Sequence, residues 1–303
     1  MISKKILVSG GAGFIGAHLV RALLKDGHQV VVVDNLSTGK KERIPDGVSF
    51  HLVDITDLDS LKPLLVGVEA VFHLAALPRV SFSIDHPIES NEANVKGTLN
   101  LLVSAKDAGV KIFVYSASSS AYGDQDILPL VETMPARPKS PYGLQKYIGE
   151  LYAKTFTEIY GLPTVCLRYF NVYGPGDSAE ASYPLVITKF IKQRQNNEPL
   201  TICGSGEQTR DFTHVTDIVR ANLLCLDNLK IGRGEVVNIG AGNNQSVKRI
   251  AELVGGPVEF LPARLEPKDT KADNSKAKEL LGWEPQVSIE EGINELKQLA
   301  GLL

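Results

Sequence analysis

Tyr142 and Lys146 lie four residues apart in the segment SPYGLQKYIGE, residues 140–150, and of the nine tyrosines only Tyr142 has a lysine at this spacing. The Ser140-Pro141 pair is typical of a helix start, and side chains four apart share one helix face. A tyrosine has an ordinary pKa of about 10, too high for a base at neutral pH. A neighbouring ammonium stabilises the phenolate and lowers that pKa, so the pair could transfer protons. The spacing alone is equally compatible with an exposed, amphipathic helix.

The segment ILVSGGAGFIG, residues 6–16, places glycines at 10, 13 and 16 directly after a short apolar run. Between a strand and a helix, Gly10 permits a tight turn, Gly13 lets a pyrophosphate approach the backbone, and Gly16 allows close helix packing. The unpaired N–H groups of the helix start then bind phosphate. Asp34 ends the next apolar run 18 residues after Gly16, near the position of a carboxylate that binds an adenine ribose.

Asp34 favours NAD over NADP, because its charge would repel a 2′-phosphate and no arginine follows at once. Asp54 and Ile55, after the third apolar run, are candidate contacts to the adenine ring. The alternatives are an ordinary surface acid beside a tight turn for Asp34, and a plain strand-end acid for Asp54.

Hydroxyl side chains cluster in SASSSAYG, residues 116–123, at the end of another apolar run. Parallel α/β sheets bind ligands at the carboxyl ends of their strands, so these serines are candidates for a binding or catalytic site. A polar strand exit without a role remains the alternative for each of them except Ser118, whose position is considered below.

The elements that must position these residues alternate through the first half of the chain. Apolar, β-branched runs cover 5–9, 29–34, 48–52, 70–74, 111–116 and 164–168, and amphipathic segments cover 16–25, 58–65, 91–108 and 142–160. This alternation predicts an α/β fold with a Rossmann-type, doubly wound parallel sheet. After residue 169 the pattern loosens, with helices near 184–196 and 215–226, which predicts a smaller C-terminal domain that caps the ligand crevice.

The composition excludes several classes of protein. The 303 residues include 22% charged residues and carry a net charge of −3, so we expect no binding to nucleic acid or to anionic membranes. No apolar stretch approaches the roughly 20 residues of a transmembrane helix. The three cysteines and six histidines lack disulfide or metal-ligand spacing, so we expect no metal and a reducing compartment. With no segment typical of a signal peptide, we expect a cytoplasmic protein.

Taken together, these motifs resemble those of the extended short-chain dehydrogenase/reductases, within them the nucleotide-sugar epimerase/dehydratase family, and most closely its UDP-glucose and UDP-N-acetylglucosamine 4-epimerases. The resemblance covers residue 3 to about 285. The segments that carry it, besides the glycine loop and the Tyr142–Lys146 pair, are DNLSTG (34–39), HLAAL (73–77), SASSSAYGD (116–124), RYFNVYGP (168–175) and TRDFTHVTDI (209–218).

The resemblance implies an NAD-binding Rossmann domain formed by 1–168 and about 212–240, and a nucleotide-sugar-binding domain formed by about 169–211 and 241–303. It implies three catalytic residues: Tyr142 as the base, Lys146 as its partner and ligand of the nicotinamide ribose, and Ser118 as the hydroxyl that relays the proton. The NAD contacts that it implies are Gly10, Gly13, Phe14, Ile15, Gly16, Asp34, Asn35, Ser37, Gly39, Asp54, Ile55, Leu74, Ala75, Ala76, Asn94, Ser116, Tyr142, Lys146 and Tyr169.

The same resemblance implies a set of contacts to the UDP-sugar. They are Ser118, Ser119, Tyr142, Asn171, Val186, Arg210, Arg264 and Glu266. The two arginines would pair with phosphate oxygens, for which a guanidinium is well suited, although surface or core salt bridges remain the alternative. The chain is one residue shorter than its relatives between Arg264 and Asp269, which places Glu266 in doubt.

The expected reaction is 4-epimerisation of UDP-glucose and UDP-galactose, by transient oxidation at C4 with tightly bound NAD, a 4-keto intermediate and hydride return to the opposite face. Family dehydratases carry an Asp-Glu pair after the catalytic hydroxyl, where this chain has Ser119 and Ser120, so dehydration is disfavoured. The small Thr270 ahead of Ala272-Asp273 implies that UDP-GlcNAc and UDP-GalNAc are also accepted.

Three alternatives stay open. Arg79 could bind a C6 carboxylate, as in a UDP-glucuronate 4-epimerase or decarboxylase. A reductase that releases NADH and a non-catalytic NAD-binding protein are the other two. The resemblance also implies a homodimer, formed through the helices near 91–108 and 142–160.

Overall fold

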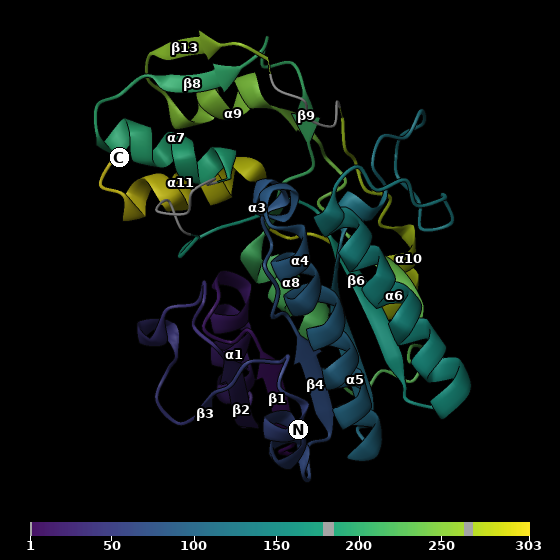
Figure 1. Cartoon of the computed structure of the whole chain (residues 1–303). Coiled ribbons are helices and arrows are strands. Elements are labelled where there is room, and N and C mark those ends of the chain that lie inside the picture. The colour runs from purple at the N-terminus through teal and green to yellow at the C-terminus, as the bar shows by residue number, and fades with distance from the viewer. Residues whose placement is uncertain (1, 178–184, 264–268) are drawn as a thin grey trace.

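The computed structural model describes residues 2–177, 185–263 and 269–303. Within these ranges a seven-stranded, fully parallel sheet has the order β11-β6-β5-β4-β1-β2-β3 (Figure 1). Its strands are β1 (Lys5–Ser9), β2 (Gln29–Asp34), β3 (Ser49–Leu52), β4 (Ala70–His73), β5 (Ile112–Ser118), β6 (Thr164–Tyr169) and β11 (Glu235–Ile239). This is the predicted Rossmann-type, doubly wound sheet, and the fold class is confirmed.

Helices cover both faces of the sheet. One face packs against α1 (Phe14–Lys25), α8 (Val215–Leu223) and α10 (Ser275–Leu281), and the other against α2 (Leu58–Leu61), α5 (Gly97–Asp107) and α6 (Pro141–Tyr160). The valines of β2 show why a strand covered on both faces is almost wholly apolar. The side chains of Val30 and Val32 pack in the core on the α1 face of the sheet, and those of Val31 and Val33 pack in the core on the α5 face. A polar side chain on either face would therefore be buried.

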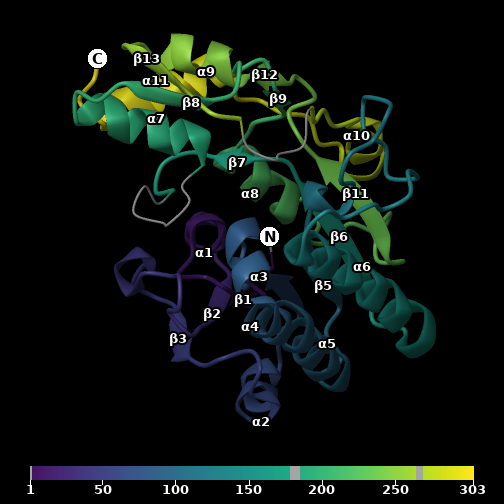
Figure 2. The same ribbon diagram turned by 45° about the horizontal axis from the view of Figure 1, so that its top comes forward.

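A smaller unit lies beyond one end of the sheet, on the side away from the N-terminus (Figure 1). It consists of the parallel pair β8 (Leu200–Cys203) and β13 (Val258–Leu261) with α7 (Val186–Gln195), α9 (Val247–Val254) and α11 (Ile289–Leu299). α7 and α9 pack against β8, and α11 packs against both of these helices, around a core that includes Phe190 and Ile250 (Figure 2). Because β1 begins at the N-terminus, the carboxyl ends of the strands face this unit.

The predicted domain boundaries stay a prediction, and the cores add one detail to them. α10 and the fully buried Trp283 fall inside the predicted second domain, yet they pack in the core of the sheet. Within the described ranges, no helix combines the length and the apolar character needed to cross a membrane.

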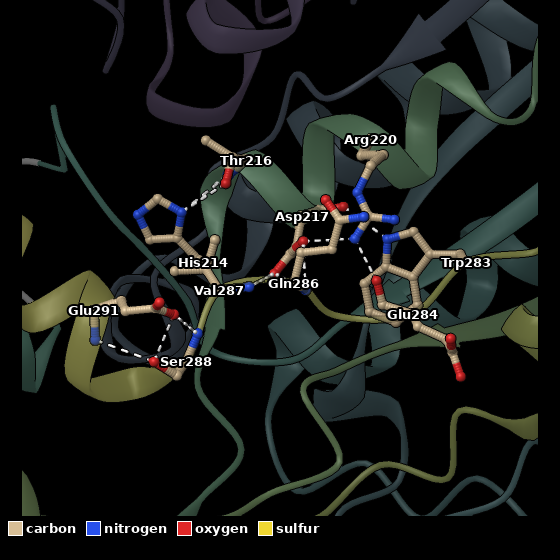
Figure 3. A network of polar contacts seen from close by, with 10 residues as sticks. All are labelled: His214, Thr216, Asp217, Arg220, Trp283, Glu284, Gln286, Val287, Ser288 and Glu291. Carbon is tan, nitrogen blue, oxygen red and sulfur yellow. Dashed lines mark hydrogen bonds and ion pairs between the residues drawn. The ribbon is translucent and has the colours of Figure 1, made fainter.

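Two passages of the chain between the units lie side by side. β7 (Val172–Tyr173) leaves the sheet and β10 (Thr213–His214) returns to it, and the two strands pair in parallel. Asp217, in the first turn of α8, makes a second connection (Figure 3). Its carboxylate accepts hydrogen bonds from the backbone N–H groups of Gln286 at 3.0 Å and Val287 at 3.1 Å, just before α11 begins.

Candidate active site

The predicted proton-transfer pair lies at the start of α6. The Ser140 hydroxyl caps the helix by accepting a hydrogen bond from the N–H of Gly143 at 3.1 Å, and Pro141 stands in the first turn. The N–H of Tyr142 is therefore not used by the helix, and it donates to the Ser83 hydroxyl at 3.0 Å. This bond fixes α3 (Val80–Asp85), which carries Ser83, beside the predicted base.

Two glycines let α6 lie very close to the sheet. A Cβ at Gly143 would lie 2.7 Å from the carbonyl oxygen of Ser120, and a Cβ at Gly149 would lie 2.2 Å from the Tyr115 hydroxyl. Any larger residue would therefore push the helix outward. The close docking buries Lys146, which is only 4% exposed.

Lys146 points at the carboxyl end of β5. Its Nζ donates to the carbonyl oxygen of Ser116 at 2.8 Å and lies 5.0 Å from the centre of the Tyr115 ring. Burial lowers the pKa of Lys146 to about 8, against the opposing charge of Glu150. Lys146 therefore gains or loses its proton within the neutral to mildly alkaline pH range, in which an enzyme can work.

The pKa of Tyr142 is raised, which is opposite to the direction we expected from the spacing. Burial raises it, while a hydrogen bond with the Ser118 side chain and the positive charge of Arg79 lower it. Lys146 donates its hydrogen bond to the Ser116 carbonyl, so the lysine does not set the pKa of the phenol as simply as the four-residue spacing suggests.

The serines end β5 at this same place. Ser118 is 8% exposed, and its hydroxyl accepts a hydrogen bond from the N–H of Ser120 at 3.2 Å. Ser119 is half-buried and begins the short 3-10 helix η4 (Ser119–Ala121). The structure therefore brings Ser116, Ser118, Tyr142 and Lys146 together at the carboxyl edge of the sheet, where ligands of this fold class bind.

The glycine loop between β1 and α1 has the backbone geometry of a phosphate cradle. Gly10 has a φ of 75°, and a Cβ there would lie 2.6 Å from the nitrogen of Ala75. A Cβ at Gly16 would lie 2.1 Å from the carbonyl oxygen of Gly10. Gly13 is the N-cap of α1 and provides no side-chain cap. The N–H groups of Phe14 and Ile15 in the first turn can therefore bind an anion.

Asp34 closes this cradle from the end of β2. Its Oδ2 accepts a hydrogen bond from the N–H of Ala12 at 2.9 Å, and its Oδ1 accepts from that of Leu36 at 2.8 Å. Gly39 folds back over the same loop, because a Cβ there would lie 2.8 Å from that of Ala12. Each carboxylate oxygen keeps a further lone pair, so Asp34 can still accept a hydrogen bond from a ribose hydroxyl.

The ends of β2 and β3 are joined by side chains of the predicted NAD site. The Asn35 amide donates to the Asp54 carboxylate at 2.7 Å, and the Asn35 Oδ1 accepts from the N–H of Ser37 at 3.0 Å. Burial raises the pKa of Asp54, but the hydrogen bonds from Thr56 and Asn35 together lower it by more. The pKa of Asp54 is therefore below its ordinary value. Ile55 is 7% exposed and packs in the core next to α5.

Asn94 supports the loop that follows β4, where Leu74, Ala75 and Ala76 lie half-buried. Its amide oxygen accepts from the N–H of Leu77 at 2.7 Å, and its amide nitrogen donates to the Leu77 carbonyl at 3.1 Å. Asn94 lies in the π-helical turn η3 (Glu92–Lys96), a feature frequent at functional sites. These bonds place Asn94 behind the loop, and its contact with NAD stays a prediction.

Three of the predicted NAD and sugar contacts lie toward the smaller unit, and each has its own partner in the protein. The Tyr169 hydroxyl donates to the amide oxygen of Asn222 at 2.9 Å, so the ring edge is turned into the core. The Asn171 amide donates to the carbonyl oxygen of Asp211 at 3.2 Å. Val186 begins α7 and packs against the core of the smaller unit.

Arg210 lies in β9 (Thr209–Arg210), and its Nη1 donates to the carbonyl oxygen of Thr209 at 2.9 Å. Thr270 is 9% exposed, and its hydroxyl accepts from the N–H of Asp211 at 3.3 Å. Arg264 and Glu266 lie outside the described residues. Of the predicted sugar contacts, the structure brings Ser118, Ser119 and Tyr142 together at the end of β5, and the contacts of the others with a UDP-sugar stay predictions.

Two buried acids near the site were not found from the sequence. Glu150 forms a two-pronged ion pair with Arg168, and the spacing of four from Lys146 was the signal available for it. Asp211 is fully buried beside Arg210, and its carboxylate accepts from the N–H groups of Ala241 at 2.7 Å and Ala272 at 2.8 Å. No pattern in the sequence distinguishes Asp211 from a surface acid.

Comparison with known proteins agrees with this geometry. The profile of the NAD dependent epimerase/dehydratase family matches residues 6–240. The chain belongs to this family. It is therefore an enzyme of the epimerase/dehydratase type whose cofactor is NAD.

Three similar proteins are 4-epimerases named for three different UDP-sugars. The crystal structure of a UDP-glucose 4-epimerase from Thermotoga maritima, with UDP-glucose, shares 40% identity and a TM-score of 0.92, over 97% of both chains. A UDP-N-acetylglucosamine 4-epimerase from Methanobrevibacter ruminantium, in complex with UDP-N-acetylmuramic acid, shares 36% identity and a TM-score of 0.94 over 100% of both chains. A UDP-glucuronate 4-epimerase of Thermodesulfobacterium geofontis is 39% identical over 95% of this chain and 93% of its own.

Proposed function

We propose that this protein is a UDP-hexose 4-epimerase that interconverts UDP-glucose and UDP-galactose. The observation that carries the proposal is the convergence of Ser118, Tyr142 and Lys146 at the carboxyl end of β5, facing the glycine cradle of β1. The 40% identity to a UDP-glucose 4-epimerase supports it. The absence of a carboxylic acid at Ser119 and Ser120 argues against dehydration.

When bound, NAD supplies a hydride acceptor that can also return the hydride. The side chains of the protein bind and transfer the proton of the C4 hydroxyl. Tyr142 takes the proton of the C4 hydroxyl, and Ser118, which already shares a hydrogen bond with Tyr142, holds the reacting oxygen and relays that proton. Lys146 keeps a positive charge beside the forming phenolate and is anchored on the Ser116 carbonyl. Tyr142 then gives the proton back when the ketone is reduced.

Inversion at C4 requires the sugar to turn over between the two halves of the reaction. The substrate must therefore be held mainly through its nucleotide, with few rigid contacts to the sugar. The tightly bonded dinucleotide cradle, in which Asp34 accepts from the N–H of Ala12, suits a cofactor that stays bound while the sugar turns. We include UDP-GlcNAc and UDP-GalNAc among the substrates because Thr270 is small, and its hydroxyl is bonded to the backbone of Asp211.

The decisive experiment compares UDP-galactose, UDP-GlcNAc and UDP-glucuronate side by side, without added cofactor, by NMR of the sugar anomeric signals. We expect turnover of UDP-galactose to UDP-glucose by the protein as purified. Tyr142→Phe should lower kcat at least about 100-fold, since it removes the acid–base group. Tyr147→Phe, five residues further along α6, is the matched control and should leave kcat unchanged.

Failure of the wild-type protein to invert any hexose would overturn the proposal. If UDP-GlcNAc is turned over with less than a hundredth of the efficiency of UDP-galactose, the acetamido sugars alone are excluded from the proposed substrates.

A UDP-glucuronate 4-epimerase is the second candidate, and one observation favours it. Arg79 is half-buried at the start of α3, and its charge acts on Tyr142, the proposed base for the C4 hydroxyl, while the C6 carboxylate of a glucuronate is attached to the adjacent carbon C5. Arg79→Gln should abolish turnover of UDP-glucuronate if this candidate is correct. It should leave UDP-galactose turnover within a few-fold if the first candidate is correct.

We also propose a homodimer that uses α6. Leu144 and Leu151 are seven residues apart on one face of this helix and are both exposed, and Ile159 continues the apolar face. Light scattering should give twice the mass of one chain, and Leu151→Asp should shift the protein toward the monomer. A monomeric wild-type protein at micromolar concentration would contradict this part of the proposal.

A further inference from the structure

Glu150 continues the catalytic face of α6 by one more turn. It lies four residues after Lys146, as Lys146 lies four after Tyr142, so the three side chains follow one line along the helix. Glu150 is 3% exposed. A carboxylate buried to this extent is costly unless a positive charge and hydrogen bonds compensate it.

Arg168, in β6, provides that compensation. Its Nε donates to the Oε1 of Glu150 at 2.7 Å, and its Nη2 donates to the Oε2 at 2.6 Å. The guanidinium also lies 4.4 Å from the centre of the Tyr122 ring. This two-pronged geometry fixes the carboxylate in one orientation relative to the sheet. The pair therefore ties the helix of the base to the strand beside it.

The surroundings of Lys146 offer it no other negative charge among the described residues. On its own helix the titratable neighbours are Tyr142 and Glu150. From β5 it faces Tyr115, whose pKa burial raises well above its ordinary value, so that ring stays neutral. From β4 it faces His73, whose pKa is lowered to about 3, first by burial and then by Lys146 itself. Glu150 opposes the loss of the Lys146 proton.

We propose that Glu150, held in place by Arg168, is a positioning residue whose negative charge keeps Lys146 protonated at the pH at which the enzyme works. The inference rests on the role of Lys146 in the proposed function. Without this carboxylate, a buried lysine next to a positively charged nicotinamide would lose its proton, and the phenolate of Tyr142 would lose its counter-charge.

The test is a titration of the Lys146 side chain, which needs neither substrate nor turnover. Protein with 13Cε-labelled lysine is titrated by NMR between pH 6 and 11, and the Lys146→Met variant assigns the signal. We expect the Lys146 signal of Glu150→Gln to titrate at least about one pH unit below that of the wild type. Glu158→Gln is the matched control, because Glu158 stands four after Lys154 on the same helix but is exposed. It should leave the Lys146 titration unchanged.

A second variant keeps the test valid if Glu150→Gln leaves Arg168 unpaired and unfolds the protein. Glu150→Met with Arg168→Met removes both charges together, a replacement that is often neutral for stability. We expect this double variant to melt near the wild-type temperature and still to show the lowered titration of Lys146. In both variants the basic limb of the kcat profile should move to lower pH by the same amount.

A Lys146 titration that is unchanged in both variants would overturn the inference, since the pair would then serve only to hold α6 on β6. A wild-type basic limb in the folded double variant would overturn it as well. A protein that turns over no UDP-hexose, but whose Lys146 titration falls in Glu150→Gln, would contradict the proposed function and leave the electrostatic role of Glu150 intact.

Discussion

Helix α6 carries the same pair of residues twice, about two turns apart: Lys146 with Glu150, and Lys154 with Glu158. The first two side chains are 4% and 3% exposed. The side chains of the second pair are each 60% exposed and lie 3.7 Å apart. Spacing thus determines which side chains are neighbours, while docking on the sheet determines whether their charges have a chemical consequence.

The cause of the difference lies in the small residues of the helix. Gly143 lets the first half of α6 approach η4 within contact distance, and Gly149 does the same at β5. The last turn ends with Ile159 and Tyr160, which are both exposed. The four predictions below test this comparison, from the largest expected effect to the smallest.

Lys146→Met should lower kcat about 1,000-fold, because the ammonium beside the base is lost. Lys154→Met should stay within about two-fold of the wild type, since its ammonium is solvated. Steady-state assays on UDP-galactose measure both. Equal losses in the two variants would mean that burial does not distinguish the lysines.

Glu150→Ala should lower the free energy of unfolding by about 3–5 kcal/mol, because it leaves the Arg168 guanidinium buried without its partner. Glu158→Ala removes only a solvated ion pair, so no change beyond experimental error is expected. Urea denaturation measures both. A loss below 1 kcal/mol for Glu150→Ala would show that water reaches Arg168 in the folded protein.

The stability gained by Lys146→Met should depend on pH. The pKa of Lys146 is lowered to about 8 in the folded protein from an ordinary 10.5, so the folded state binds fewer protons between these values. The wild-type protein therefore gains stability relative to the variant as pH rises from 8 to 10.5. The advantage of the variant should be largest below pH 8 and should decline by on the order of 3 kcal/mol by pH 10.5. Lys154→Met should show no such trend in denaturation at several pH values.

Gly149→Ala should cost about 1–3 kcal/mol, because the added methyl group would meet the Tyr115 hydroxyl. The helix would have to move away from β5, so kcat should fall with stability. Lys154→Ala adds no such contact and serves as the control. A stabilised Gly149→Ala protein, as helix propensity alone would give, would show that the docking of α6 is loose.

The sequence was sufficient for six of the seven strands of the sheet and for the glycine loop at its edge. Runs such as the valines of β2 are almost wholly apolar because both faces are covered, which makes a parallel sheet recognisable. The glycine loop was recognisable for a similar reason, since Gly10 and Gly16 have no room for a side chain. Patterns that each residue must satisfy locally are the ones that a sequence reveals.

What the sequence could not show depends on contacts between distant segments. Glu150 meets Arg168 only because β6 lies under α6. Asn94 was predicted as a ligand of NAD, and only the fold shows that its amide is bonded to Leu77. β11 was not singled out either, because Glu235 and Asn238 interrupt its apolar signal, although its last three residues are buried.

The parallel pair of β7 and β10 has a mechanical consequence for the whole enzyme. Two hydrogen-bonded strands resist shear and twist far better than one, so the smaller unit cannot rotate freely about a single covalent link. The bonds of Asp217 to the segment before α11 add a second fastening at another point. The hydroxyl of Tyr173 in β7 also donates to the carbonyl oxygen of Ser288, at the N-cap of α11. Any displacement of the smaller unit must therefore break or strain all of these contacts, while the contacts of α6 with β5 lie outside this connection.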